Sequence, residues 1–202
     1  MPNLYLCSCI WIHRMEKSLA QADTRCLKVV LYGPESTGKS TLAQKLAQHY
    51  NTQWVPEYAR TYLQKKWDQE QAICTVEDLI PIAYGQMESE NRLAVLAHNI
   101  LFCDTDLLVT QTYSEIYFDG YCPPVIREYV QKNDYDLYLL MNTDLPWVAD
   151  DLRDRPNDRN AMFARFQQSL IDHKKPHTII SGSNATRFKM AIDAIEKHFA
   201  HV

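Results

Sequence analysis

The sequence predicts an α/β fold, in which a five-stranded parallel sheet is covered by helices on both faces. Two observations predict it. Short apolar runs alternate with longer amphipathic stretches, which is typical of strands and helices that wind into a parallel sheet. The first apolar run also leads straight into a glycine-bounded loop and then a helix. Ligands of such sheets bind at the carboxyl ends of the strands, so residues that directly follow strands are the candidates for function.

The expected strands are short apolar runs that end at polar residues or turns. They lie at residues 27–32, 52–55, 100–103, 136–141 and 178–180. The helices between them are marked by apolar stripes, caps and helix-opening prolines. The first helix has an apolar stripe at Leu42, Leu46 and Tyr50, and a second helix is expected to end at Trp67. A capping box at Thr75 and Asp78 precedes a third helix to about His98, and Pro123 and Pro124 precede a fourth to about Gln131. The last two helices have an apolar stripe at Phe163, Phe166 and Leu170 and another from about Ala185 to Phe199.

A chain of 202 residues fits one globular domain. We expect residues 1–26 to be an N-terminal extension outside the core, and residues 27–202 to be the domain, with a lid at about 148–160. The apolar stretch 4–12 has no positive charge before it and is too short to span a bilayer, so we expect neither a signal peptide nor a membrane segment. Met15 is an alternative start of translation.

The composition limits the kinds of partner that the protein is expected to bind. Hydrophobic residues make up 46% and charged residues 23% of the chain, which is ordinary for a soluble protein. The net charge of −4 gives no electrostatic reason to expect a nucleic acid or an anionic membrane as partner. The six cysteines include no C-x-x-C pair, which favours free thiols of a reducing cytoplasm over disulfides or zinc. We therefore expect a cytoplasmic protein that acts on a small molecule.

The loop after the first strand has the sequence GPESTGKS, residues 33–40, and fits the phosphate-binding pattern G-x-x-x-x-G-K-[ST]. Its glycines let the backbone approach a ligand and turn its amides toward an anion at a helix N-terminus. Lys39 is expected to reach the β- and γ-phosphates of ATP, and the Ser40 hydroxyl to bind Mg²⁺. The residues predicted to bind ATP are Gly33, Glu35, Ser36, Thr37, Gly38, Lys39, Ser40 and Thr41.

Acidic residues follow the second and third strands. Asp104 is predicted to hold Mg²⁺ opposite the loop, with a helix cap as the alternative. Asp106 either faces the substrate or caps the next helix, and the sequence leaves both open. Glu57 is predicted to orient an acceptor hydroxyl and take its proton, with a surface ion pair to Arg60 as the alternative.

Three arginines, Arg153, Arg155 and Arg159, lie between the fourth strand and the following helix. Guanidinium groups suit charge that is spread over phosphate oxygens, and a mobile segment that carries them would close over a triphosphate. Aspartates interleave with them, so a solvated charged loop is the alternative. The residues predicted to be catalytic are Lys39, Glu57, Asp104, Arg153 and Arg155.

Four blocks occur together in one order, and together they resemble the ribosylnicotinamide kinase domain of NadR proteins, a P-loop kinase. The blocks are GPESTGKS at 33–40, EYAR at 57–60, DTD at 104–106 and WVADDLR at 147–153. The resemblance runs from about Leu27 to the C-terminus. It implies a kinase-like sheet with an arginine-bearing lid, and ATP-dependent phosphorylation of the 5′-hydroxyl of nicotinamide riboside to nicotinamide mononucleotide, in NAD salvage.

The same resemblance implies roles for single residues. Lys39 and Ser40 would serve ATP and Mg²⁺, while Glu57, Tyr58, Arg60 and Asp106 would lie near the riboside. The best-known NadR proteins also carry an adenylyltransferase domain, and some carry a DNA-binding helix-turn-helix. This chain has room for neither, so we expect a stand-alone kinase.

Two other functions stay open at this point. One is a kinase of another nucleoside or small alcohol, because the sequence does not place the side chains that select the acceptor. The other, of a different class, is a nucleotide-binding regulatory ATPase. A guanine-specific switch would need the pattern N-K-x-D after a later strand, and residues 142–145 read NTDL. A kinase should consume ATP quickly only when its acceptor is present.

Overall fold

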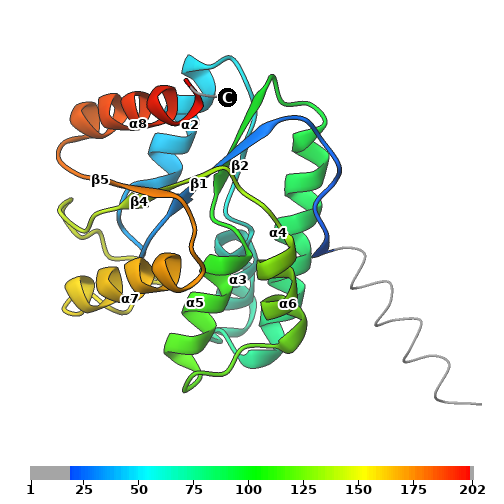
Figure 1. The fold of residues 1–202 in the computed structure, drawn as a ribbon. Helices are drawn as coiled ribbons and strands as arrows, with labels where there is room; N and C mark the ends of the chain where they lie inside the picture. The colour runs from blue at the N-terminus through cyan, green and yellow to red at the C-terminus, as the bar shows by residue number, and fades with distance from the viewer. Residues whose placement is uncertain (1–18, 201–202) are drawn as a thin grey trace, which may run out of the picture.

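The computed structural model describes residues 19–200, and its sheet contains five parallel strands in the order β2-β3-β1-β4-β5 (Figure 1). The strands are β1 (Leu27–Tyr32), β2 (Trp54–Val55), β3 (Ile100–Asp104), β4 (Leu137–Met141) and β5 (His177–Ile180). The chain thus has the predicted α/β fold, with β1 at the centre of the sheet.

Helices cover both faces of the sheet, as predicted (Figure 1). They are α2 (Lys39–His49), α3 (Tyr58–Glu70), the 3₁₀ turn η1 (Val76–Asp78), α4 (Leu79–Ala94), α5 (Leu107–Tyr117), α6 (Pro124–Lys132), α7 (Arg159–Asp172) and α8 (Asn184–Phe199). Helices α2 and α8 cover one face, and α4, α5, α6 and α7 cover the other. Within residues 19–200, no helix combines the length and apolar character needed to cross a membrane.

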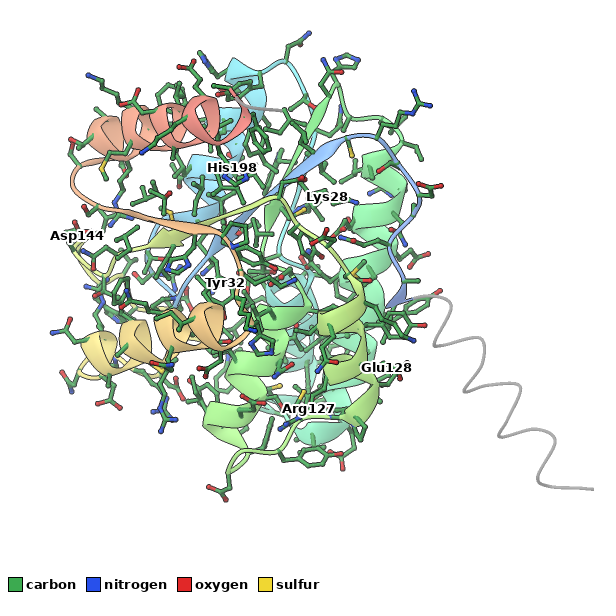
Figure 2. All side chains as sticks on the ribbon, in the orientation of Figure 1. Lys28, Tyr32, Arg127, Glu128, Asp144 and His198 are labelled. Carbon is green, nitrogen blue, oxygen red and sulfur yellow. The ribbon has the colours of Figure 1, made fainter. Side chains whose placement is uncertain are left out.

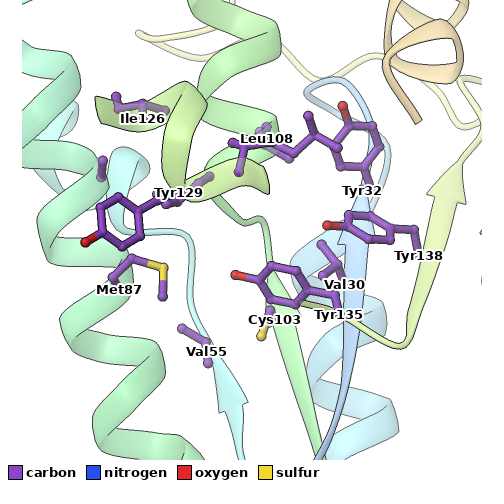
Figure 3. Packing of buried hydrophobic residues seen from close by; sticks show 14 of the residues in the cluster. Val30, Tyr32, Val55, Met87, Cys103, Leu108, Ile126, Tyr129, Tyr135 and Tyr138 are labelled. Carbon is purple, nitrogen blue, oxygen red and sulfur yellow. The ribbon is translucent and has the colours of Figure 1, made fainter. Parts of the chain in front are cut away.

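Strand β1 is buried on both of its sides, which explains why it reads as a continuous apolar run. Val29 and Leu31 pack toward α2 and α8, whereas Val30 and Tyr32 pack toward α5 and α7. Figure 3 shows the second side, where the Tyr32 ring meets the Tyr138 ring edge to face at a centroid distance of 5.6 Å. The central strand that precedes the phosphate loop is therefore fixed from both faces.

The element boundaries differ from the sequence-based ones at several places, by one to about four residues. Strand β2 has only two residues, because only Trp54 and Val55 pair with β3. Helix α4 ends at Ala94 instead of near His98, and tighter turns follow it, with the amide of Leu96 bonded to Leu93 O. The capping box of Thr75 and Asp78 is confirmed, although it begins the short turn η1 that leads into α4.

The segment 19–26 packs on the domain, so the boundary predicted at residue 26 lies too late in the chain. Leu19 is 1% exposed and belongs to the core. The side-chain nitrogen Nδ2 of Asn133 donates to Leu19 O over 2.9 Å, and the side-chain nitrogen Nε2 of Gln21 donates to Glu90 Oε1 over 2.9 Å. The predictions for residues 1–18, including a start at Met15, lie outside the described residues.

Candidate active site

The loop 33–40 has the backbone of an anion-binding turn. Gly33 and Gly38 take φ values of +135° and +80°, which favour glycine. A Cβ on Gly33 would lie 3.0 Å from Met141 O, so the close approach of β4 also demands a glycine there. The loop then opens helix α2 at Lys39, and the positive end of the helix dipole points toward the loop.

Lys39 lies inside this loop, where its side chain is only 7% exposed. Its ammonium donates to Gly33 O and Pro34 O, each over 3.0 Å. These two carbonyls hold the charge against the loop that is predicted to bind the phosphates. The position agrees with the predicted contact between Lys39 and a triphosphate, which stays a prediction.

Ser40 and Asp104 meet across the gap between α2 and β3. The Ser40 hydroxyl donates to Asp104 Oδ2, and the Asp104 side chain is buried, with an Oδ1 atom that has no hydrogen-bond partner among residues 19–200. Burial, followed by the nearby charge of Glu57, raises the pKa of Asp104 from 3.8 to about 7, while Lys39 and the Ser40 hydroxyl oppose the shift. A buried carboxylate oxygen without a partner is costly unless a ligand satisfies it.

The side-chain oxygens of this pair suit the Mg²⁺ ion that accompanies ATP in kinases. Hydroxyl and carboxylate oxygens are the donors that Mg²⁺ prefers, and Asp104 Oδ1 is a free, buried acceptor. Within residues 19–200, no group of three or more His, Cys, Asp or Glu side chains is arranged so that it could hold a metal ion by itself. The ion would therefore take its other ligands from phosphate oxygens and water, as Mg²⁺ sites commonly do.

Glu57 occupies the cap position of α3 but makes no capping hydrogen bond. Its carboxylate is close enough to Asp104 to raise the pKa of that residue. The ion pair predicted as its alternative role is absent from the contacts of residues 19–200, because Arg60 Nη2 binds Asp150 Oδ2 over 2.7 Å instead. Glu57 thus lies near Asp104 and has no ion pair among the contacts of residues 19–200.

Asp106 serves the fold, which answers the alternative left open by the sequence. It is 1% exposed, its Oδ1 accepts from the amide of Val109 over 3.0 Å, and its Oδ2 accepts from the Tyr138 hydroxyl over 2.7 Å. Burial raises the pKa of Asp106 to about 6. Because both oxygens are engaged inside the protein, the structure favours the cap of α5 over the predicted contact with the riboside.

The segment 148–160 lies against the phosphate loop. The amide of Val148 donates to Ser36 Oγ over 3.0 Å, and Arg159 Nη2 donates to Ser36 O over 3.3 Å. The amide of Arg155 donates to Glu35 Oε1 over 3.5 Å. The segment that carries the arginines therefore touches the loop at three places.

The aspartates of this segment are paired, which argues against a merely solvated loop. Asp150 binds Arg60 of α3 and also Arg153 Nε, the latter over 3.0 Å. Asp154 accepts from the Tyr117 hydroxyl over 2.5 Å, and the Arg155 guanidinium lies 4.6 Å from the centre of the Tyr117 ring. These contacts tie the segment to α3 on one side and to α5 on the other.

Arg187 of α8 is a residue that sequence reasoning missed. It is 1% exposed, and it donates to Thr37 O over 2.6 Å, to Asn142 O over 2.8 Å and to Gly182 O over 2.9 Å. It also pairs with Asp144, which Figure 2 labels. The only signal in the sequence is a charged residue next to the apolar stripe of the last helix.

A family profile described as an AAA domain matches residues 28–187. The match includes the phosphate loop, all of the acids discussed above and Arg187. The chain belongs to this family.

The chain is also similar to NadR proteins, which confirms the resemblance seen in the sequence. It is 33% identical over 153 residues to the trifunctional NAD biosynthesis/regulator protein NadR of Salmonella typhimurium (strain LT2). The match covers 75% of this chain and 36% of that protein, so the chain spans little more than a third of the length of this relative.

Two solved structures support the fold. A crystal structure of NadR in complex with NR has a TM-score of 0.74 at 23% identity, and the match covers 88% of this chain and 53% of that chain. A structure of NadR in complex with NAD and AMP-PNP has a TM-score of 0.69 at 22% identity, with 88% and 51% covered. The protein therefore has the kinase-type fold of these relatives.

Proposed function

We propose that this protein is an ATP-dependent kinase that phosphorylates the 5′-hydroxyl of nicotinamide riboside and gives nicotinamide mononucleotide. The observation that carries the proposal is the hydrogen bond from Ser40 to the buried carboxylate of Asp104, which lies beside the loop lysine and has Glu57 nearby. These groups provide an anion cradle, a pair of Mg²⁺ ligands and a carboxylate that is free to receive a proton.

In the proposed reaction, the acceptor oxygen forms a bond to the γ-phosphorus while the bond from that phosphorus to the β–γ bridging oxygen breaks, and ADP leaves. Glu57 orients the acceptor hydroxyl and takes its proton. Lys39 and the loop amides hold the phosphates, and Ser40 and Asp104 would hold Mg²⁺, which neutralises phosphate charge when bound. Arg153 and Arg155 would bring guanidinium groups over the transferring group.

The acceptor is proposed from the relatives and from the sequence blocks. One NadR structure holds NR and another holds AMP-PNP, an analogue of ATP, and both share the fold of this chain. The EYAR block follows β2, with Glu57 directly before α3 and with Tyr58 and Arg60 in the first turn of that helix, which supports an acceptor site at this end of the sheet. A kinase of another nucleoside would use the same groups, so the acceptor is the part to test first.

The test is a panel assay with ATP, Mg²⁺ and a series of ribosides and deoxyribosides, in which mass spectrometry identifies the phosphorylated product. We expect nicotinamide mononucleotide to form fastest. Lys39→Ala is the control, and it should lose about a hundredfold or more in turnover, because the transferring phosphoryl group loses a fixed positive charge. A different nucleoside as the preferred acceptor would overturn the substrate. Rapid ATP hydrolysis that no acceptor stimulates would favour a regulatory ATPase.

A further inference from the structure

Glu57 follows the end of β2 and Asp104 is the last residue of β3; these two strand ends, called here the acidic turns, are joined by very little sheet. Strand β2 pairs with β3 only through Trp54 opposite Phe102 and Val55 opposite Cys103. If this parallel register continued, Glu57 would lie opposite Thr105. No ladder hydrogen bond between the two strands reaches that far, so something other than the sheet must hold the end of β2 beside the end of β3.

A side chain from α4 spans this gap. Gln86 is 2% exposed, and its Oε1 accepts from the amide of Tyr58 over 2.9 Å. Its Nε2 donates to Thr105 O over 3.5 Å. One buried amide therefore bonds to the residue after Glu57 and to the residue after Asp104, and so connects the two acidic turns.

Gly85, the residue before Gln86 on α4, packs against the same turn. A Cβ on Gly85 would lie 2.2 Å from Cε1 of the Tyr58 ring, so the ring rests directly on the helix surface at this glycine. The main chain of Tyr58 is thus held by Gln86 and its ring by Gly85. Because Glu57 supplies no cap to α3, the Tyr58 amide depends on Gln86 for its hydrogen bond.

We propose that Gln86 is a positioning residue for phosphoryl transfer, which sets the place of the Glu57 carboxylate relative to Asp104. This inference rests on the proposed function, since Glu57 is there the group that orients the acceptor. Loosening the turn would misplace the carboxylate by about an ångström, and such errors cost about a hundredfold in rate. Within the described part of the chain, Gln86 forms hydrogen bonds with Tyr58 and Thr105 and with no residue of the loop 33–40, so ATP binding should not change.

The test compares Gln86→Leu, Gln86→Glu and Gln111→Leu with the wild-type protein. Leucine removes both hydrogen bonds, whereas glutamate keeps an acceptor for the Tyr58 amide. Gln111 is a matched control, because it is a buried glutamine of α5 that bonds to Glu115 and to neither acidic turn. The acceptor is whichever member of the panel the wild-type protein phosphorylates, so an incorrect substrate assignment leaves this test intact.

We expect Gln86→Leu to lower kcat about tenfold to a hundredfold with the KM for ATP within about twofold of wild type. Gln86→Glu should recover part of the loss, and Gln111→Leu should keep a near-normal kcat. Hydrogen exchange adds a readout without catalysis, since the Tyr58 amide should lose protection in Gln86→Leu and keep it in Gln86→Glu. Gly85→Ala, which displaces the Tyr58 ring, should lower kcat in the same selective way.

Several results would overturn the proposal. These are an unchanged kcat in Gln86→Leu, an equal loss in Gln111→Leu, a loss confined to the KM for ATP, or an unchanged exchange rate of the Tyr58 amide. If Gln86→Leu does not fold, kcat and the exchange rate of the Tyr58 amide are measured in Gly85→Ala and Gln86→Glu instead.

Discussion

The guanidinium of Arg187 donates to the carbonyl oxygen of Thr37 over 2.6 Å, although 150 residues separate the two in the chain. The same guanidinium binds the loop after β4 through Asn142 O and Asp144. One buried cation thus connects the phosphate loop, the end of β4 and the last helix. Its hydrogen bonds satisfy carbonyl groups that face the interior of the protein.

Replacing Arg187 by Met should destabilise the protein by about 3 kcal/mol, because the change removes a buried guanidinium and leaves the carbonyls of Thr37, Asn142 and Gly182 without this donor. Urea unfolding measures this loss. ATP affinity should also fall, since Thr37 loses its support. Lys189→Met is the matched control, because it removes a positive charge from an exposed position of the same helix. Equal stabilities of the two variants would show that the Arg187 contacts contribute nothing.

Asp104→Asn should raise the Mg²⁺ concentration needed for half-maximal activity about tenfold to a hundredfold. The amide has no charge and offers one oxygen where the carboxylate offers two, so the ion would be held less firmly. Magnesium titration at saturating ATP is the measurement. If the magnesium dependence stays at its wild-type value while kcat falls, Asp104 has a role other than binding the metal.

Glu57→Gln should lower kcat more than it weakens ATP binding. The substitution keeps the shape of the side chain but removes the proton acceptor, and a loose transition state makes positioning the larger part of the effect. We expect a loss of about a hundredfold in kcat, within the usual range for an acid–base residue. Steady-state kinetics with separate titrations of ATP and acceptor measure it. A loss confined to ATP affinity would move Glu57 out of the acceptor site.

Glu35 should make stability depend on pH. Burial raises the pKa of Glu35 from 4.5 to about 6 in the folded protein, with the Arg155 amide, Lys39 and Arg153 opposing the shift. Between these two pKa values the folded state holds a proton that the unfolded chain has lost. The resulting stabilisation of the folded state is complete below pH 4.5 and disappears as the pH rises through 6.

Glu35→Gln removes this contribution, so the variant should gain stability relative to wild type on going from pH 4.5 to pH 7.5. We expect a relative gain of about 1 kcal/mol, since solvent screens a partly exposed carboxylate. Thermal unfolding at the two pH values measures it. Glu88→Gln, at an exposed position of α4, is the control, and the same pH trend in both variants would contradict the assignment.

The sequence predicts the parts of the fold that depend on neighbouring residues. The loop pattern and the apolar run before it locate β1, the turn and the start of α2, because glycine, lysine and serine are needed there at fixed spacing. The same local logic finds Glu57 and Asp104, since each follows an apolar strand. The close approach of Ser40 to Asp104 agrees with their predicted shared role.

Contacts between distant segments are what the sequence does not reveal. Asp106 has the same sequence environment whether it caps a helix or meets a substrate, and only the Tyr138 hydroxyl, from another strand, distinguishes the two. Gln86 is an ordinary polar residue in a helix until β2 and β3 are placed beside it. The partners of the arginine-bearing segment likewise come from α3 and α5.

The Gln21 contact decides where a shortened form of this protein can begin. Glu90 is fully buried, and its two carboxylate oxygens accept hydrogen bonds from the side-chain amide of Gln21 and from the Tyr135 hydroxyl. A recombinant fragment that starts at Leu27 would leave one of these oxygens dehydrated and without a donor, at a cost of about 1–3 kcal/mol. We expect such a fragment to melt earlier than one that keeps residues 19–26, so vectors for expression should retain them.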